Sequence, residues 1–128
     1  MNRFVFDSSA ILTLYHNEPG KQQVLKLLDR GDPFISSANL CEVLTKLAEG
    51  GLNVTEVWET FHALEIDVVN FDTDQAIIAA DLRLKTKHLG LSLGDRACLA
   101  LSIVKKAIAV TADRNRSLLD VCRVETIR

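Results

Sequence analysis

The chain has 128 residues, of which 48% are hydrophobic and 25% charged, with only six glycines and two prolines. This composition is typical of an ordinary globular domain and excludes disordered and collagen-like chains. Fifteen basic against seventeen acidic residues give a net charge of -2. Any binding of nucleic acid must therefore depend on a local basic surface. The length predicts one domain with a substantial core.

The sequence gives no support for a leader, a membrane span or a zinc site. No apolar run reaches the roughly 18 residues that span a bilayer, and the first residues lack the apolar stretch of a signal peptide. We therefore expect a cytoplasmic protein. The three cysteines form no CxxC pair and the three histidines stand far apart. Reduced, mostly buried thiols are expected, and any metal would need oxygen ligands.

Short apolar runs alternate with segments of helical spacing along the chain. Arg3–Phe6 predicts a strand, and Ser8–Tyr15 predicts the helix that follows it. Further helices are predicted, in chain order, at residues 21–30, 38–49, 53–65, 72–88 and 92–104, with a short helical turn at 118–121. Further strands are predicted at residues 34–35, 66–69, 107–110 and 124–127, the first of them after a turn at 31–33.

Cap residues and glycines mark the ends of several of these helices. Asn53 with Glu56, and Ser92 with Asp95, have the spacing of capping boxes, and Gly50 follows the helix at 38–49. In the helix that begins near residue 72, five apolar side chains are expected to face the core: Ala76, Ile77, Ala80, Leu82 and Leu84.

Alternating strands and helices predict a three-layer α/β/α domain with a mainly parallel central sheet. In such sheets, ligands bind beyond the carboxyl ends of the strands, near the point where the strand order reverses. Asp7 follows the first strand and Asp113 follows the most hydrophobic one, while Glu42 and Asp95 lie near the starts of two helices. The sequence therefore predicts four carboxylates at one edge of the sheet.

Each of these acids also has a purely structural interpretation. Asp7 and Asp95 stand where helix caps occur, Asp113 can begin a turn, and Glu42 can be a solvated helix residue. Four like charges at one edge would repel each other, however, and a divalent cation removes that penalty. Magnesium prefers oxygen ligands and often contacts only one or two carboxylates directly. The cluster therefore favours metal-assisted hydrolysis of phosphodiester bonds.

Four segments carry a resemblance to a known family. Val5–Ser9, Ser36–Glu42, Leu93–Ala97 and Val110–Asp113 resemble, in this order, the motifs of PIN-domain ribonucleases, specifically VapC-like toxins of type II toxin–antitoxin pairs. The resemblance covers essentially the whole chain, and four ordered motifs are more specific than a single aspartate after a strand. It implies a single PIN domain over residues 1–128 and a metal-dependent endoribonuclease.

The resemblance also implies roles for individual residues. Carried over by motif, Asp7, Glu42, Asp95 and Asp113 would form an acidic site that binds Mg²⁺ or Mn²⁺. Asp7 and Asp95 are the expected direct ligands, whereas Glu42 and Asp113 would act partly by positioning water. Thr111 is a further candidate catalytic residue.

Other polar residues are weaker candidates. Ser8 or Ser9 offers a hydroxyl next to Asp7, although either can equally cap the helix. Arg96 stands directly after Asp95, where a family member can carry another acid, so the number of metal ions stays open. Cationic residues near the site segments are candidates for phosphate contacts, although a solvated charge is their more common role: Arg83, Lys85, Lys87, His88, Arg96, Arg114 and Arg116.

The resemblance implies partners as well as RNA. The predicted helices at 38–49 and 53–65 carry apolar residues beyond one narrow stripe, Trp58 and Phe61 among them. This pattern predicts an exposed groove for a helix of a cognate antitoxin, together with a homodimer. Trp58, Phe61 and Tyr15 are more typical of a core or an interface than of base stacking.

Other classes of protein remain as alternatives. The most serious is a non-catalytic PIN-like module that binds RNA or another protein. A haloacid-dehalogenase-like phosphatase would need a second aspartate two residues after Asp7, where this chain has Ser9. A signalling receiver domain would need an acidic pair near the N-terminus, where this chain has one acid.

Overall fold

The computed structural model describes residues 2–114 and 120–128. Within these residues, five parallel strands form one sheet in the order β3-β2-β1-β4-β5. The strands are β1 (Arg3–Phe6), β2 (Asp32–Ser36), β3 (Asp67–Val69), β4 (Ile108–Thr111) and β5 (Val124–Thr126). The helices are α1 (Ser8–Tyr15), α2 (Lys21–Arg30), α3 (Ser37–Glu49), α4 (Val54–His62), α5 (Thr73–Lys85) and α6 (Leu93–Lys105), with a 3-10 turn η1 (Lys87–Leu89).

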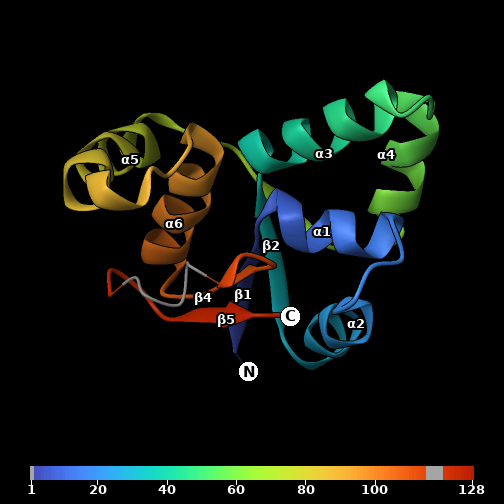
Figure 1. The fold of residues 1–128 in the computed structure, drawn as a ribbon, viewed down its shortest axis with the longest axis horizontal. Helices are drawn as coiled ribbons and strands as arrows, with labels where there is room; N and C mark the ends of the chain where they lie inside the picture. Colours follow the sequence, from blue (N-terminus) through green and yellow to red (C-terminus); the bar gives the residue numbers. More distant parts are fainter. Residues whose placement is uncertain (1, 115–119) are drawn as a thin grey trace.

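Helices cover both faces of the sheet, with α5 and α6 on one side and α1 to α4 on the other (Figure 1). The alternation of side chains along the strands separates two apolar cores. Phe4 and Phe6 of β1 pack in the core beneath α1 to α4, whereas Val5 between them packs in the core beneath α5 and α6. This arrangement confirms the predicted three-layer α/β/α architecture around a parallel sheet.

The strand order reverses between β1 and β4. From β1 the chain builds outward through β2 to β3, and then returns to place β4 on the other side of β1. Asp7 directly follows β1, and its backbone N–H donates to the carbonyl of Val110 on β4 at 3.0 Å. Asp7 caps α1, and Ser36 at the end of β2 caps α3. The first turns of two helices therefore begin at the carboxyl edge of the sheet, next to the reversal point.

Two element boundaries differ from the sequence prediction. The turn expected at 31–33 is wrong beyond Gly31, because β2 already begins at Asp32, and Pro33 pairs with Phe4 of β1. The helix expected to run to residue 65 ends at His62, and Glu65 has a positive φ of 58°. The other predicted strands and helices lie within one to three residues of their observed bounds.

The predicted inward face of α5 is wrong for most of its residues. Ile77 and Leu84 are 64% and 78% exposed, whereas Gln75, Ala79 and Leu82 are buried. These three residues recur at the spacing of one helical stripe. Gln75 can lie on the buried stripe because its Nε2 donates to the carbonyl of Asn70 at 3.0 Å. Hydrophobicity alone therefore selected the wrong side of this helix.

Three further expectations concern the segment at 118–121, the cysteines and membrane-spanning helices. Of the helical turn expected at 118–121, residues 118 and 119 lie outside the described residues, and residues 120 and 121 are not helical. Of the thiols, Cys98 is buried and Cys122 half-buried, but Cys41 is exposed, so the expectation of mostly buried cysteines is wrong for Cys41. Among the described helices, none is both long enough and apolar enough to cross a bilayer.

Candidate functional site

Asp7 is buried at the point where the strand order reverses, with 7% of its surface exposed. Its Oδ1 accepts the N–H of Ala10 at 2.9 Å, as a helix cap does, and the hydroxyl of Ser9 at 2.7 Å. Burial raises the pKa of the Asp7 carboxyl, hydrogen bonding from Ser9, Thr111 and Ala10 offsets only part of that effect, and the nearby charge of Asp95 adds to it. The helix cap is therefore also a desolvated acid close to a second acid.

Ser9 joins Asp7 to the end of β4. Its Oγ accepts the N–H of Ala112 at 3.0 Å and lies 3.3 Å from Oγ1 of Thr111. Both hydroxyls also hydrogen-bond the Asp7 carboxyl, and each of these bonds lowers the pKa of that acid. Thr111 Oγ1 in turn accepts the N–H of Asp113 at 3.1 Å. Of the two serines considered from the sequence, Ser9 is therefore the one that contacts both Asp7 and the β4 end.

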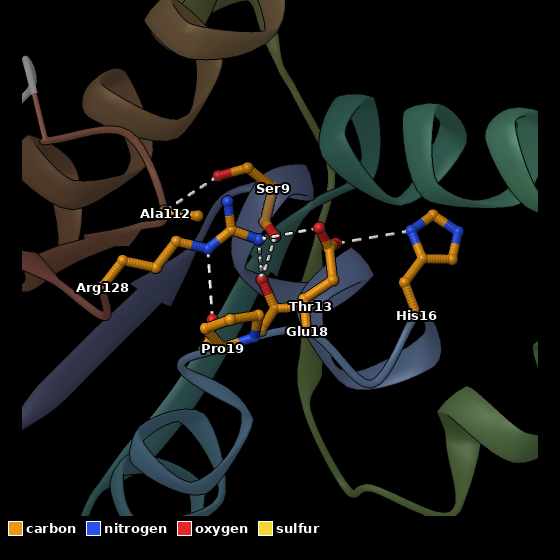
Figure 2. A network of polar contacts seen from close by, with 7 residues as sticks. All are labelled: Ser9, Thr13, His16, Glu18, Pro19, Ala112 and Arg128. Carbon is orange, nitrogen blue, oxygen red and sulfur yellow. Dashed lines mark hydrogen bonds and ion pairs between the residues drawn. The ribbon is translucent and has the colours of Figure 1, made fainter.

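The chain of contacts continues from Ser9 to the last residue of the sequence (Figure 2). The hydroxyl of Thr13 donates to the carbonyl of Ser9 at 2.9 Å. Arg128 donates from Nη2 to Thr13 Oγ1 at 3.4 Å and from Nε to the carbonyl of Pro19 at 3.1 Å, and its Nη2 pairs with Glu18 at 3.1 Å. Thr13 and Arg128 were missed by the sequence analysis, since neither stands in a motif and their separation in sequence hides the contact.

Asp95 begins α6 and closes a capping box with Ser92. Its N–H donates to Ser92 Oγ at 3.1 Å, and its Oδ2 accepts the N–H of Ser92 at 2.9 Å. A small cavity of about 10 Å³, roughly the room of one water molecule, lies between the two aspartates. The residues that line it are Asp7, Asp95, Cys98, Leu99, Ala109, Thr111 and Val124. The capping interpretation of Asp95 is thus confirmed, and the same residue also faces the candidate site.

Glu42 comes from α3 and lies against the start of α6. Its Oε1 accepts the side-chain N–H of Asn39 at 2.9 Å, and the same Nδ2 donates to the carbonyl of Gly94 at 3.0 Å. A Cβ at position 94 would overlap the Glu42 carboxylate. Asn39 was missed by the sequence analysis. Its position three residues before Glu42, on the same helical face, was the available signal.

Of the four predicted acids, Asp7 and Asp95 line one cavity, and Glu42 lies against Gly94, the residue before Asp95. Among the described residues, no three His, Cys, Asp or Glu side chains are arranged so that they already surround a metal ion. Three of these carboxylates already accept hydrogen bonds from the protein: Asp7 from Ser9 and Ala10, Asp95 from Ser92, and Glu42 from Asn39. Direct contact with one or two carboxylates is enough for magnesium, which keeps several of its waters.

The cationic candidates differ in their surroundings. Arg96 turns to α5, where its Nη1 donates to the carbonyl of Ala79 at 2.9 Å. Lys85 pairs with Asp81 at 2.9 Å on the exposed side of α5. Arg83, Lys87 and His88 are exposed. Arg116 lies outside the described residues.

The aromatic candidates lie away from the acids. Phe61 is fully buried in the core, so it does not line an exposed groove as expected. Trp58 is partly exposed and stacks on Phe61 with 6.1 Å between ring centroids. The hydroxyl of Tyr15 is 2.8 Å from that of Thr60 on α4. The Trp58–Phe61 stack therefore lies within α4, whereas the Tyr15 contact joins α1 to α4.

A three-layer domain with carboxylates at its strand reversal defines a class of α/β proteins, and comparisons with known proteins give its family. The PIN domain model matches residues 4–123, and the chain belongs to the PIN domain family. Among curated proteins, none matches this sequence.

Solved structures share this fold at low sequence identity. One is a toxin-antitoxin complex from Klebsiella pneumoniae, with a TM-score of 0.76, 21% identity and 97% of each chain covered. Another is DNA-bound VapBC from Salmonella typhimurium, with a TM-score of 0.73, 22% identity and 100% of each chain covered. A third is FitAcB from Neisseria gonorrhoeae, with a TM-score of 0.74, 18% identity and 97% of each chain covered. At these identities the likeness establishes the fold.

Proposed function

We propose that this protein is a divalent-metal-dependent endoribonuclease, a single PIN domain that acts as the toxin of a type II toxin–antitoxin pair in the cytoplasm. The observation that carries the proposal is the buried carboxylate of Asp7, close to the charge of Asp95, at the strand reversal of a PIN domain. Similarity of fold to chains from toxin-antitoxin complexes supports the biological role.

The residues present suit magnesium or manganese. The donors in reach are carboxylate and hydroxyl oxygens, which are the ligands that these hard ions prefer. Burial raises the pKa of Asp7 because its charge is poorly solvated, and a cation would supply the compensation that water cannot. We propose that Asp7 and Asp95 contact the ion directly, while Glu42 and Asp113 hold the water around it.

The chemistry follows from these positions. A divalent ion, when bound, supplies positive charge that activates water and stabilises charge developing on the phosphate. The chain itself contributes the orientation of its acids: Ser9 fixes Oδ1 of Asp7, and the α6 cap fixes Asp95. Thr111 keeps Ser9 in place from the end of β4. Phosphate contacts would come from exposed basic side chains such as Arg83, Lys87 and His88.

The proposed protein partners are an antitoxin and a second copy of the chain. Along α3 and into α4 runs an apolar groove lined by Ser37, Leu40, Cys41, Leu44, Thr45, Ala48, Glu49 and Val54. Leu52, Val54 and Trp58 expose large apolar surfaces nearby. Such a surface suits the apolar face of an amphipathic helix.

The ribonuclease proposal is tested with the purified full-length chain and RNA. Cleavage should require Mg²⁺ or Mn²⁺ and stop in EDTA. Asp7→Asn should abolish it, whereas Asp29→Asn, which changes an exposed acid on α2, should leave it unchanged. Cleavage that survives complete chelation would overturn the metal mechanism.

The alternative of a non-catalytic module predicts a different result. In that case RNA or a partner protein would bind, no phosphodiester bond would break, and Asp7→Asn would bind equally well. The toxin role is tested separately by expression in a bacterial host. Growth should stop with the parent, continue with Asp7→Asn, and recover when the product of a small adjacent reading frame is co-expressed.

A further inference from the structure

Asn39 is a buried amide that joins α3 to α6. It is 1% exposed, and its Nδ2 donates to Oε1 of Glu42 at 2.9 Å and to the carbonyl of Gly94 at 3.0 Å. Both hydrogens of the amide nitrogen are therefore used, one on a carboxylate and one on the backbone next to Asp95. A single side chain thus sets how the Glu42 carboxylate lies relative to the start of α6.

Packing and stability alone do not account for an asparagine here. Its Oδ1 is buried without a hydrogen-bond partner, and a buried, unsatisfied carbonyl oxygen is unfavourable. An apolar side chain of similar size would avoid that cost if the position served only the core. The two donated hydrogen bonds, and in particular the one to the Glu42 carboxylate, are the feature that an apolar side chain could not reproduce.

Gly94 lies against the same carboxylate. It lies in the first turn of α6 without the positive φ that favours glycine, and glycine is a weak helix former. A Cβ at this position would overlap all three carboxylate atoms of Glu42. The absence of a side chain at position 94 is therefore what gives the Glu42 carboxylate its space.

We infer that Asn39 is a positioning residue which, with Gly94, fixes the Glu42 carboxylate beside Asp95 in the acidic site. The inference rests on the proposed metal-dependent ribonuclease function. Asn39 itself does not contact the ion or the RNA in this proposal. Asn39 acts through Glu42. Its loss should therefore change the affinity of the site for a cation and the kcat of cleavage, and leave the KM for RNA unchanged.

The test compares four variants of the full-length protein. Asn39→Asp keeps the shape of the side chain but replaces the donor with a second carboxylate, and Asn39→Ala removes the group. Gly94→Ala leaves Asn39 intact and displaces the Glu42 carboxylate. Gln75→Leu is the matched control, because Gln75 is also a buried amide with an unpaired carbonyl oxygen but lies on α5 and bonds Asn70.

Mn²⁺ affinity is measured by calorimetry without RNA, and RNA cleavage supplies kcat and KM. We expect Mn²⁺ affinity and kcat to fall by about 10- to 100-fold in both Asn39 variants and in Gly94→Ala, with the KM for RNA unchanged. Gln75→Leu should retain parental affinity and kcat even if its melting temperature falls. In a Glu42→Gln background, Asn39→Ala should have little further effect on Mn²⁺ affinity.

Parental Mn²⁺ affinity and kcat in folded Asn39 variants would overturn the inference and leave the proposed function standing. Equal losses in Gln75→Leu would also overturn it, because they would reduce the effect to general destabilisation. If the parent binds Mn²⁺ but cleaves no RNA, the ribonuclease proposal fails, and the ordering of Mn²⁺ affinities still decides the role of Asn39. A parent that binds no Mn²⁺ overturns both.

Discussion

The hydroxyl of Ser9 donates a 2.7 Å hydrogen bond to Oδ1 of Asp7, the same oxygen that caps α1 through Ala10. A helix cap and a candidate catalytic acid are therefore one carboxylate. Because Ser9 also accepts the N–H of Ala112, the orientation of Asp7 depends on how the end of β4 lies against α1. Strand pairing at the centre of the sheet is thereby linked to the geometry of the acidic site.

Ser9→Ala should weaken cleavage and shift its pH dependence. The substitution removes a hydrogen bond that lowers the pKa of Asp7, so the acidic limb of the pH–rate profile should move to higher pH. The loss of one partly buried hydrogen-bonding group should cost about 1 kcal/mol of stability. Ser8→Ala, one residue earlier and outside this network, is the control. A profile that does not move in Ser9→Ala would show that Asp7 is not the titrating group.

Asp7→Asn should stabilise the metal-free protein at neutral pH. The pKa of Asp7 is raised from 3.8 on folding, so the contribution of the protonated acid to stability is fully present below that value and is lost as pH rises through the folded pKa. Asparagine keeps an oxygen that can accept from Ala10 and does not titrate. Urea midpoints in EDTA should therefore favour the variant near pH 7, and its advantage should shrink toward pH 4. A variant that is less stable than the parent across this range would contradict the predicted sign.

Sequence patterns predicted most of the strands and helices, and the caps at the starts of some helices, because these features depend on local signals. Asp7 follows an apolar run, and Ser92 with Asp95 has the spacing of a capping box, which the structure contains. A cap and a site acid give the same local signal, so the pattern could not separate the two interpretations of Asp95. The structure adds the second feature, since Asp95 also lines the cavity beside Asp7.

Features that depend on contacts between distant segments were not predictable in the same way. Asn39 and Gly94 are 55 residues apart, and Arg128 reaches Thr13 across 115 residues. Arg96 was a candidate for phosphate contact, yet its guanidinium donates to a carbonyl of α5. The choice of partner in each case is set by how helices pack, which hydrophobic periodicity does not encode.

Gly20→Ala should destabilise the fold more than Gly51→Ala. Both glycines have a positive φ, 102° and 98°, so alanine is strained at either position by about 1–2 kcal/mol. Only at Gly20 would the new Cβ meet another segment, at 2.5 Å from the carbonyl oxygen of Ile127. The difference between the two urea midpoints isolates that contact. Equal midpoints would mean that the segment after β5 does not rest on the turn before α2 in solution.

Asp95→Asn should abolish RNA cleavage while changing the stability of the metal-free fold only slightly. Asparagine can still accept the N–H of Ser92, so the cap loses only its charge, which contributes roughly 0.3 to 1 kcal/mol at a helix N-terminus. Removing that charge also relieves its repulsion of Asp7, which offsets the loss. The unfolding midpoint in EDTA should therefore be no lower than that of the parent. Added Mg²⁺ should raise the midpoint of the parent but not that of the variant, since only a native state that binds the ion is stabilised by it. An Asp95→Asn protein that cleaves RNA and melts earlier would mean that Asp95 serves the helix cap alone, and its assignment to the acidic site would have to be withdrawn.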